Sequence, residues 1–195
     1  MKKLSTLLLL GLMSLNLAAQ KMSKDKKAVV ASVEKHKENL IKISDSIWAL
    51  AETAFEESIS AELLADYAEE NGMTVTRGVA DIPTAFIATY GSGSPVISVL
   101  GEFDALPGLS QEAIPEKKSA GGAAGHACGH HLFGAGSAWS AVTIKDWLSK
   151  NNKKGTIRFY GTPAEEGGSG KVYMVREGLF DDVDVVLHWH PGSVN

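Results

Sequence analysis

Histidine, cysteine and glutamate side chains gather in three short polar stretches of this chain. The first, GHACGHH at residues 125–131, holds three histidines and the only cysteine of the sequence. The second, GTPAEEGGSGK at 161–171, carries two adjacent glutamates, and the third, HWHP at 188–191, adds two histidines. Nitrogen, sulfur and carboxylate ligands together suit Zn²⁺ or a similar divalent ion. The three stretches therefore predict a metal site suited to hydrolysis of an amide bond.

The residue types of the first two stretches suggest different roles, metal binding in one and metal binding with proton transfer in the other. Cys128 and His130 are two residues apart, so sulfur and nitrogen can enter one site, on one metal or around two. Of Glu165 and Glu166, one can bind metal while its neighbour takes a proton from water and delivers it to the leaving nitrogen. A structural zinc site is the alternative, but such sites are usually richer in cysteine. One cysteine with a nearby acid pair favours a catalytic site.

The GHACGHH stretch leads directly into a helix. Leu132, Ala135, Trp139 and Val142 recur at the spacing of one helical face. The positive end of a helix dipole lowers the pKa of a nearby thiol. This position therefore favours the thiolate form of Cys128 that metal coordination needs.

The elements around these stretches predict an α/β domain. Amphipathic spacing indicates helices over residues 28–54 and 60–70, after a frayed leader at 21–27, and a short helix over 171–177. Short apolar or alternating runs indicate strands at 74–77, 85–90, 96–100, 156–160 and 183–187. This order predicts three layers, with a mixed sheet and helices on both faces.

The polar stretches lie at or near the exits of predicted strands. The run 96–100 leads to Glu102 and Asp104, GTPAEEGGSGK follows 156–160, and HWHP follows 183–187. Open α/β sheets bind ligands at the carboxyl ends of their strands. The sequence therefore predicts that these side chains converge on one site.

The N-terminus has the pattern of a secretory signal peptide. Lys2 and Lys3 precede an apolar run at 4–17, and small residues follow at 18–20. The run is too short for a stable membrane span; a buried or interfacial helix is the alternative. We expect residues 1–20 to be removed, leaving a periplasmic or secreted chain without a membrane span. A lone Cys128 in an oxidising compartment is then best explained as a metal ligand.

The composition excludes some classes of protein. Hydrophobic residues make up 44% of the 195 residues and charged residues 22%, as in an ordinary globular domain. The net charge of −4 gives no reason to expect a nucleic-acid partner.

Taken together, GEFDALPG, GHACGHH, GTPAEEGGSGK and WHP resemble the N-terminal half of the metal-dependent amidohydrolases and carboxypeptidases. That family includes aminobenzoyl-glutamate, auxin-conjugate and hippurate hydrolases, and the aminobenzoyl-glutamate branch is the most similar. The resemblance extends over about residues 26–191. It implies that residues 21–195 form part of a zinc-exopeptidase-like catalytic domain, without the lid or dimerisation domain and the C-terminal half.

The resemblance also implies residue roles. Cys128 and His130 match two metal ligands, Glu165 matches the general base, and Glu166 matches a further metal ligand.

The last ligand within these motifs comes from HWHP. It is His190 if the pattern is Trp-His-Pro and His188 if the pattern is His-x-x-Pro, and we expect His190. Asp104 and His126 match supporting positions. His131 departs from the family, which usually has Asp or Asn there.

The implied activity is metal-dependent hydrolysis of an amide bond to an amino acid. Implied substrates are N-acyl or N-aroyl amino acids, compounds like aminobenzoyl-glutamate, and small peptides. The implied cofactor is a pair of divalent ions, zinc with manganese or cobalt as alternatives, and full-length relatives are expected to be homo-oligomers. Two other functions stay open: a metal-binding remnant without turnover, and a di-zinc aminopeptidase that requires a free amino terminus on its substrate.

Overall fold

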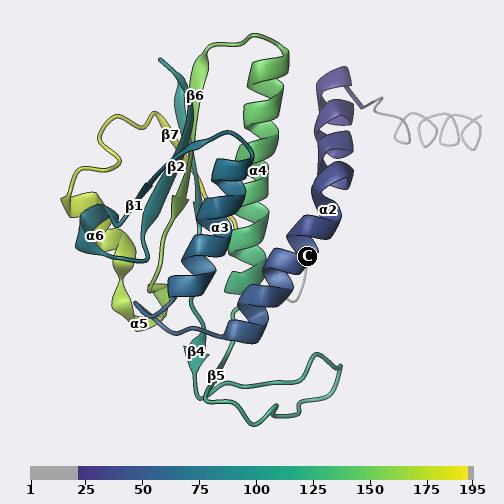
Figure 1. Cartoon of the computed structure of the whole chain (residues 1–195), viewed down its shortest axis with the longest axis vertical. Helices are drawn as coiled ribbons and strands as arrows, with labels where there is room; N and C mark the ends of the chain where they lie inside the picture. The colour runs from purple at the N-terminus through teal and green to yellow at the C-terminus, as the bar shows by residue number, and fades with distance from the viewer. Residues whose placement is uncertain (1–21, 193–195) are drawn as a thin grey trace, which may run out of the picture.

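A five-stranded mixed sheet forms the middle layer of the protein (Figure 1). The computed structural model describes residues 22–192, so the predicted signal peptide lies outside the described residues. The strands follow one another across the sheet in the order β1-β2-β6-β3-β7. Their bounds are β1 Thr74–Arg77, β2 Phe86–Ser92, β3 Val96–Gly101, β6 Gly155–Gly161 and β7 Val185–Leu187.

The direction of the strands determines where the polar stretches end. β2 pairs antiparallel with both β1 and β6, whereas β3 pairs parallel with both β6 and β7. β6 and β3 are in register from Val96 opposite Thr156 to Gly101 opposite Gly161. The carboxyl ends of β6, β3 and β7 therefore meet at one edge of the sheet, as the sequence predicts.

Helices cover both faces of the sheet, which confirms the predicted three-layer α/β architecture (Figure 1). One face carries the long helices α2 (Lys24–Leu50), α3 (Ser58–Glu70) and α4 (His130–Lys150). The main core lies beneath them and includes Ile47, Leu64, Phe86 and Phe159.

The opposite face of the sheet has a smaller cover. It consists of α5 (Glu165–Gly168), α6 (Gly170–Arg176) and the 3₁₀ helix η1 (Val79–Asp81). A second apolar cluster joins Leu100 and Tyr160 of the sheet to Met174 of α6. Alternate residues of β3 and β6 thus face the two cores, which is why both strands are largely buried and mostly apolar.

Local backbone features explain where α2 differs from its predicted range. The helix begins at Lys24, within the predicted frayed leader, because the Ser23 hydroxyl accepts a hydrogen bond from Lys26 N at 3.2 Å. It ends at Leu50 because Ala51 adopts a left-handed conformation, with φ 48°.

The carboxylate of Glu52 holds the start of α3. It accepts hydrogen bonds from the backbone N–H groups of Ile59 at 3.0 Å and Ser60 at 2.8 Å. These N–H groups have no partner within the helix, so a carboxylate from the preceding loop stabilises it.

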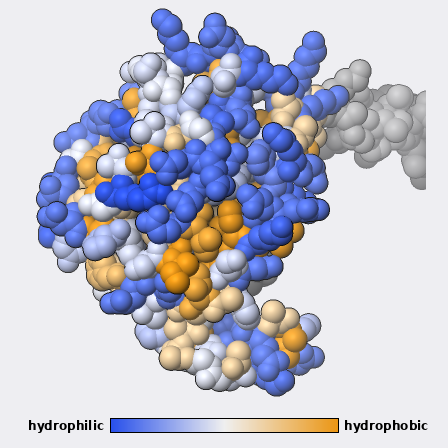
Figure 2. All heavy atoms as spheres, in the orientation of Figure 1, coloured by the Kyte–Doolittle hydropathy of each residue, from blue (hydrophilic) through white to orange (hydrophobic). Residues whose placement is uncertain are grey.

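A long loop extends from the sheet to the surface. β4 (Leu106–Pro107) and β5 (Ala124–Gly125) pair at the base of the exposed loop 108–123. The view in Figure 2 is largely hydrophilic, with an apolar patch near its centre. Among the helices of residues 22–192, none has the length and hydrophobicity to cross a membrane.

Candidate metal centre

The site lies where β3, β6 and β7 end. Beyond the last ladder pair, Thr162 joins two of these exits: its N–H and its hydroxyl donate to Gly101 O at 2.9 and 3.1 Å. Glu102 and Asp104 follow Gly101 directly, so the acids from one strand face the stretch leaving the next.

His130, the first residue of α4, is the fully buried centre of this arrangement. Its Nδ1 lies 2.9 Å from Asp104 Oδ1 and 3.0 Å from Asp104 O. Nδ1 therefore carries a hydrogen and donates it to Asp104, which turns Nε2 towards the other polar groups. Glu102 Oε2 lies 3.0 Å from Nε2.

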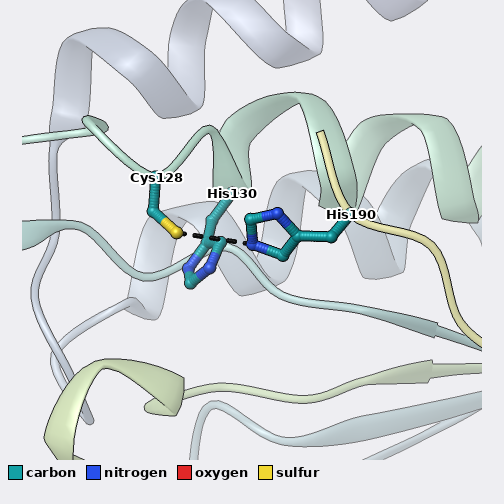
Figure 3. Close-up of side chains that lie close together, drawn as sticks. All are labelled: Cys128, His130 and His190. Carbon is teal, nitrogen blue, oxygen red and sulfur yellow. Dashed lines mark hydrogen bonds between the residues drawn. The ribbon is translucent and has the colours of Figure 1, made fainter. Parts of the chain in front are cut away.

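Cys128 and His190 approach His130 from different segments (Figure 3). Cys128 Sγ lies 3.4 Å from His190 Nε2, and one ligand atom from each of these three residues falls within 4.8 Å of the others. His190 Nδ1 donates to Pro191 O at 2.8 Å, so Nε2 is the ring nitrogen available to a metal.

The structure separates the two histidines of HWHP. His188 Nε2 lies 3.5 Å from Glu102 Oε1, outside the group formed by Cys128, His130 and His190.

Gly136 of α4 and Gly129, which directly precedes α4, allow the HWHP stretch to pack closely against that helix. A Cβ at Gly136 would lie 2.8 Å from the Trp189 ring, and one at Gly129 would lie 2.8 Å from the Pro191 ring. Trp189 Nε1 also donates to Ser137 Oγ at 3.0 Å. This packing places both histidines over the start of α4.

The two adjacent glutamates occupy different environments. Glu166 N donates to Asp104 Oδ2 at 2.7 Å, and its side chain is largely buried. Glu165 is 45% exposed, and both carboxylates lie 3.9 Å from His130 Nε2. Glu165 therefore faces an open side of the site, whereas Glu166 points into it.

The side chains fit a divalent cation. Glu166 Oε1 is buried and has no hydrogen-bond partner among residues 22–192, an arrangement that a positive ligand would compensate. A second group of possible ligand atoms, from Glu102, His130 and Glu165, also lies within 4.8 Å. Together the two groups offer ligand atoms from five side chains, more than one tetrahedral ion needs, although His130 Nε2 itself can bind only one ion.

In the protein without metal, the helix dipole is not the dominant influence on the Cys128 thiol. Burial and the neighbouring Glu166 carboxylate raise the pKa of the thiol to about 11. Burial, together with the acidic side chains around the sulfur, outweighs the effect of the helix dipole. A bound cation reverses this balance, since a coordinating thiol loses its proton.

Opposing effects act on the buried pair of Glu102 and His130. Burial lowers the pKa of His130, but its bonds to Asp104 and Glu102 outweigh burial and raise the pKa to about 10. Burial raises the pKa of Glu102, but its bonds to His130 and Lys171 lower it to about 2. Without metal the imidazolium therefore neutralises one of the surrounding carboxylates.

Lys171 is a site residue that sequence reasoning did not single out. From α6 it forms an ion pair with Glu102, which lies directly after β3. Glu102 itself was recognisable as a strand-end acid. No spacing in the sequence links it to Lys171, because 69 residues separate the two.

His126 belongs to neither group of possible metal ligands. Its Nε2 donates to Ile47 O of α2 at 3.0 Å, and burial lowers its pKa to about 4. The ring centroid of His131 is 5.1 Å away, and burial also lowers the pKa of His131. The His131 ring, on α4, thus lies beside the His126 ring, which is bonded to α2, and burial disfavours the charged form of both.

Comparison with known proteins gives consistent results. Residues 99–195 match the description "Peptidase family M20/M25/M40". The chain is 52% identical over 162 residues to one of the subunits of p-aminobenzoyl-glutamate hydrolase from Escherichia coli K12, covering 82% of this chain and 34% of that protein. It is 30% identical to human Xaa-Arg dipeptidase, covering 84% of this chain and 38% of that protein.

A solved structure has the same fold. It is a dinuclear metal-binding peptidase of the M20 family from Bacillus subtilis, 25% identical, with a TM-score of 0.68 over 82% of this chain and 44% of that one. The present chain spans about a third of the length of the curated relatives that it matches. The matched segment, the high identity and the shared fold place this chain in peptidase family M20/M25/M40.

Proposed function

We propose that this chain provides the principal ligands and the general base of a metal-dependent hydrolase that cleaves the amide bond to an amino acid. One observation carries the proposal: Glu165, an exposed carboxylate, stands beside a convergent group of Cys128, His130 and His190. A proton acceptor that is open to substrate and adjacent to metal ligands is the arrangement that hydrolysis needs.

The metal ligands in this proposal are Cys128, His130, Glu166 and His190, with Glu102 beside them. When bound, a divalent cation lowers the pKa of water and polarises a carbonyl group. Two ions are proposed, because five side chains offer ligand atoms close together and a similar solved peptidase is dinuclear. Zinc suits the mixed sulfur, nitrogen and oxygen ligands best, with manganese or cobalt as alternatives.

In this proposal Glu165 transfers protons, and Asp104 positions the residues around it. Glu165 accepts a proton from the attacking water and delivers it to the leaving nitrogen, since it is exposed enough to meet a substrate. Asp104 keeps Nδ1 of His130 protonated and so leaves Nε2 free to bind. The same Asp104 accepts the N–H of Glu166 and fixes the backbone beside the base.

The relatives point to the class of substrate. The name p-aminobenzoyl-glutamate hydrolase describes an amide bond to glutamate, and the name Xaa-Arg dipeptidase describes a peptide bond to arginine. We propose that the substrate is an N-acyl or N-aroyl amino acid or a small peptide. Residues 4–17 support export to the periplasm or medium, and the Escherichia coli relative, which is named as a subunit, supports an oligomer.

Metal stoichiometry measured together with hydrolysis tests the proposal. Zinc content and turnover of p-aminobenzoyl-glutamate would be compared for wild type, Cys128→Ala and Glu165→Gln. We expect Cys128→Ala to lose metal, and Glu165→Gln to keep metal but lose turnover. A Cys128→Ala variant that binds metal as wild type does would refute the ligand assignment.

The same assay separates the alternative functions. A wild-type chain that holds metal but hydrolyses no substrate would be the inactive remnant. Faster cleavage of dipeptides with a free amino terminus than of N-acylated ones would indicate an aminopeptidase.

A further inference from the structure

Glu57 is a buried carboxylate outside the proposed metal centre. It is fully buried just before α3, and burial raises its pKa. Its Oε1 accepts a hydrogen bond from Ala164 N at 2.8 Å, and its Oε2 accepts one from the Thr84 hydroxyl at 3.0 Å. A buried carboxylate is costly, so its partners indicate what it maintains.

The partner Ala164 directly precedes the two glutamates. Its backbone is left-handed, with φ 57° and ψ 42°, which costs a residue with a Cβ about 1–2 kcal/mol. Contacts from the rest of the fold must hold such a conformation. Glu57 binds the N–H at this position from an element 107 residues earlier.

A second carboxylate holds the other side of the same turn. Asp104 Oδ2 accepts a hydrogen bond from Glu166 N at 2.7 Å. The backbone amides on the two sides of Glu165 are therefore each bound to a buried acid. Packing also holds this turn in place, because the ring of Phe55 lies against the backbone of Gly168: a Cβ at Gly168 would lie only 2.7 Å from the ring.

We propose that Glu57 is a positioning residue: it fixes the turn at 164–166, so that Glu165 is presented to substrate and Glu166 to the metal. The proposal rests on the proposed function, because the roles of Glu165 and Glu166 do. An apolar residue of similar size at position 57 would leave Ala164 N and the Thr84 hydroxyl buried without partners. Glutamine at this position keeps an acceptor for Ala164 N.

Amide hydrogen exchange on the metal-free chain tests the positioning role without any catalysis. We expect Glu57→Ala to speed exchange across residues 162–168 roughly tenfold, as loss of a hydrogen bond to a charged group predicts. Glu57→Gln should restore slow exchange. The matched control is Glu52→Ala, because Glu52 also binds backbone amides beside α3 but does not touch this turn. Equal exchange of residues 162–168 in Glu57→Ala and Glu52→Ala would overturn the proposal.

Cobalt binding supplies the second readout, through the absorption of the thiolate–metal bond. We expect Glu57→Ala to bind Co²⁺ roughly tenfold more weakly, because a mobile turn no longer presents Glu166. Glu57→Gln should recover the affinity, and Glu52→Ala should match wild type. Unchanged affinity in Glu57→Ala would overturn the link to the metal. A wild type that binds no cobalt would instead refute the proposed metal centre, and hydrogen exchange would still decide the role of Glu57.

Discussion

Replacing Asp104 with asparagine is expected to weaken metal binding without removing a ligand. The Asp104 carboxylate is 1% exposed and accepts hydrogen bonds from two elements: His130 Nδ1 at 2.9 Å and Glu166 N at 2.7 Å. Asparagine retains one acceptor oxygen and replaces the other with an amide group that donates. Either His130 Nδ1 or Glu166 N must then face the amide NH₂ group, which is itself a hydrogen-bond donor.

Both orientations of the asparagine disturb the metal site. If the amide group faces His130, it favours the tautomer with hydrogen on Nε2, the nitrogen proposed to bind metal. If the amide group faces Glu166, the backbone N–H there loses its partner, at a cost of about 1–3 kcal/mol. Loss of such a supporting hydrogen bond typically lowers metal affinity about 10–100-fold, and we expect Asp104→Asn to fall in this range.

Competition for Zn²⁺ with a chromophoric chelator at neutral pH measures this effect. Asp184→Asn is the matched control, because Asp184 Oδ2 also accepts a backbone hydrogen bond, from Val96 N at 2.7 Å, at the opposite end of β3. The control should bind zinc as wild type does. The reasoning fails if Asp104→Asn also binds zinc with wild-type affinity, or if both variants lose affinity equally.

Three other changes test the packing and the electrostatics. Phe133 is fully buried and packs edge-on against His190 at 5.8 Å, so Phe133→Ala should lower the free energy of unfolding by about 3–5 kcal/mol, measured with urea. Gly136→Ala should cost about 1–3 kcal/mol and shift tryptophan emission, because the new Cβ would overlap Trp189; an unchanged spectrum and stability would contradict the packing. Burial raises the pKa of Glu57 above 4.5, so the folded state binds this proton more tightly than the unfolded state does. As the pH increases above about 4.5, the free energy of unfolding of Glu57→Gln should therefore rise relative to that of wild type. A difference in urea titrations that does not change with pH would argue against the raised pKa.

Much of the sheet was predictable because its strands are marked by composition. The apolar runs near 96–100 and 156–160 correspond to β3 and β6, which face cores on both sides. The position of the polar stretches at one edge of the sheet was also predictable, because each lies at or near the carboxyl end of a predicted strand. The order of strands did not, because pairing of β6 with β2 joins residues far apart in the sequence.

Contacts between distant segments explain what the sequence could not reveal. Glu57 gives no local signal, since its partner Ala164 is 107 residues away. The sequence also left His188 and His190 open, and their separation depends on how HWHP packs against α4. The raised pKa of the Cys128 thiol has the same origin, because it comes from burial in the folded chain and from acids of other segments.

The central position of β6 has a consequence for how the chain acquires its structure. β6 lies between β2 and β3, yet it comes later in the sequence than both. During synthesis β2 and β3 cannot complete their pairing until residue 161 of β6 has been made. Until then the edges of β2 and β3 that pair with β6 stay unpaired. Such non-local pairing is slow because a long loop must close first. We expect the sheet to form late, and we expect residues 1–150 expressed without β6 to aggregate.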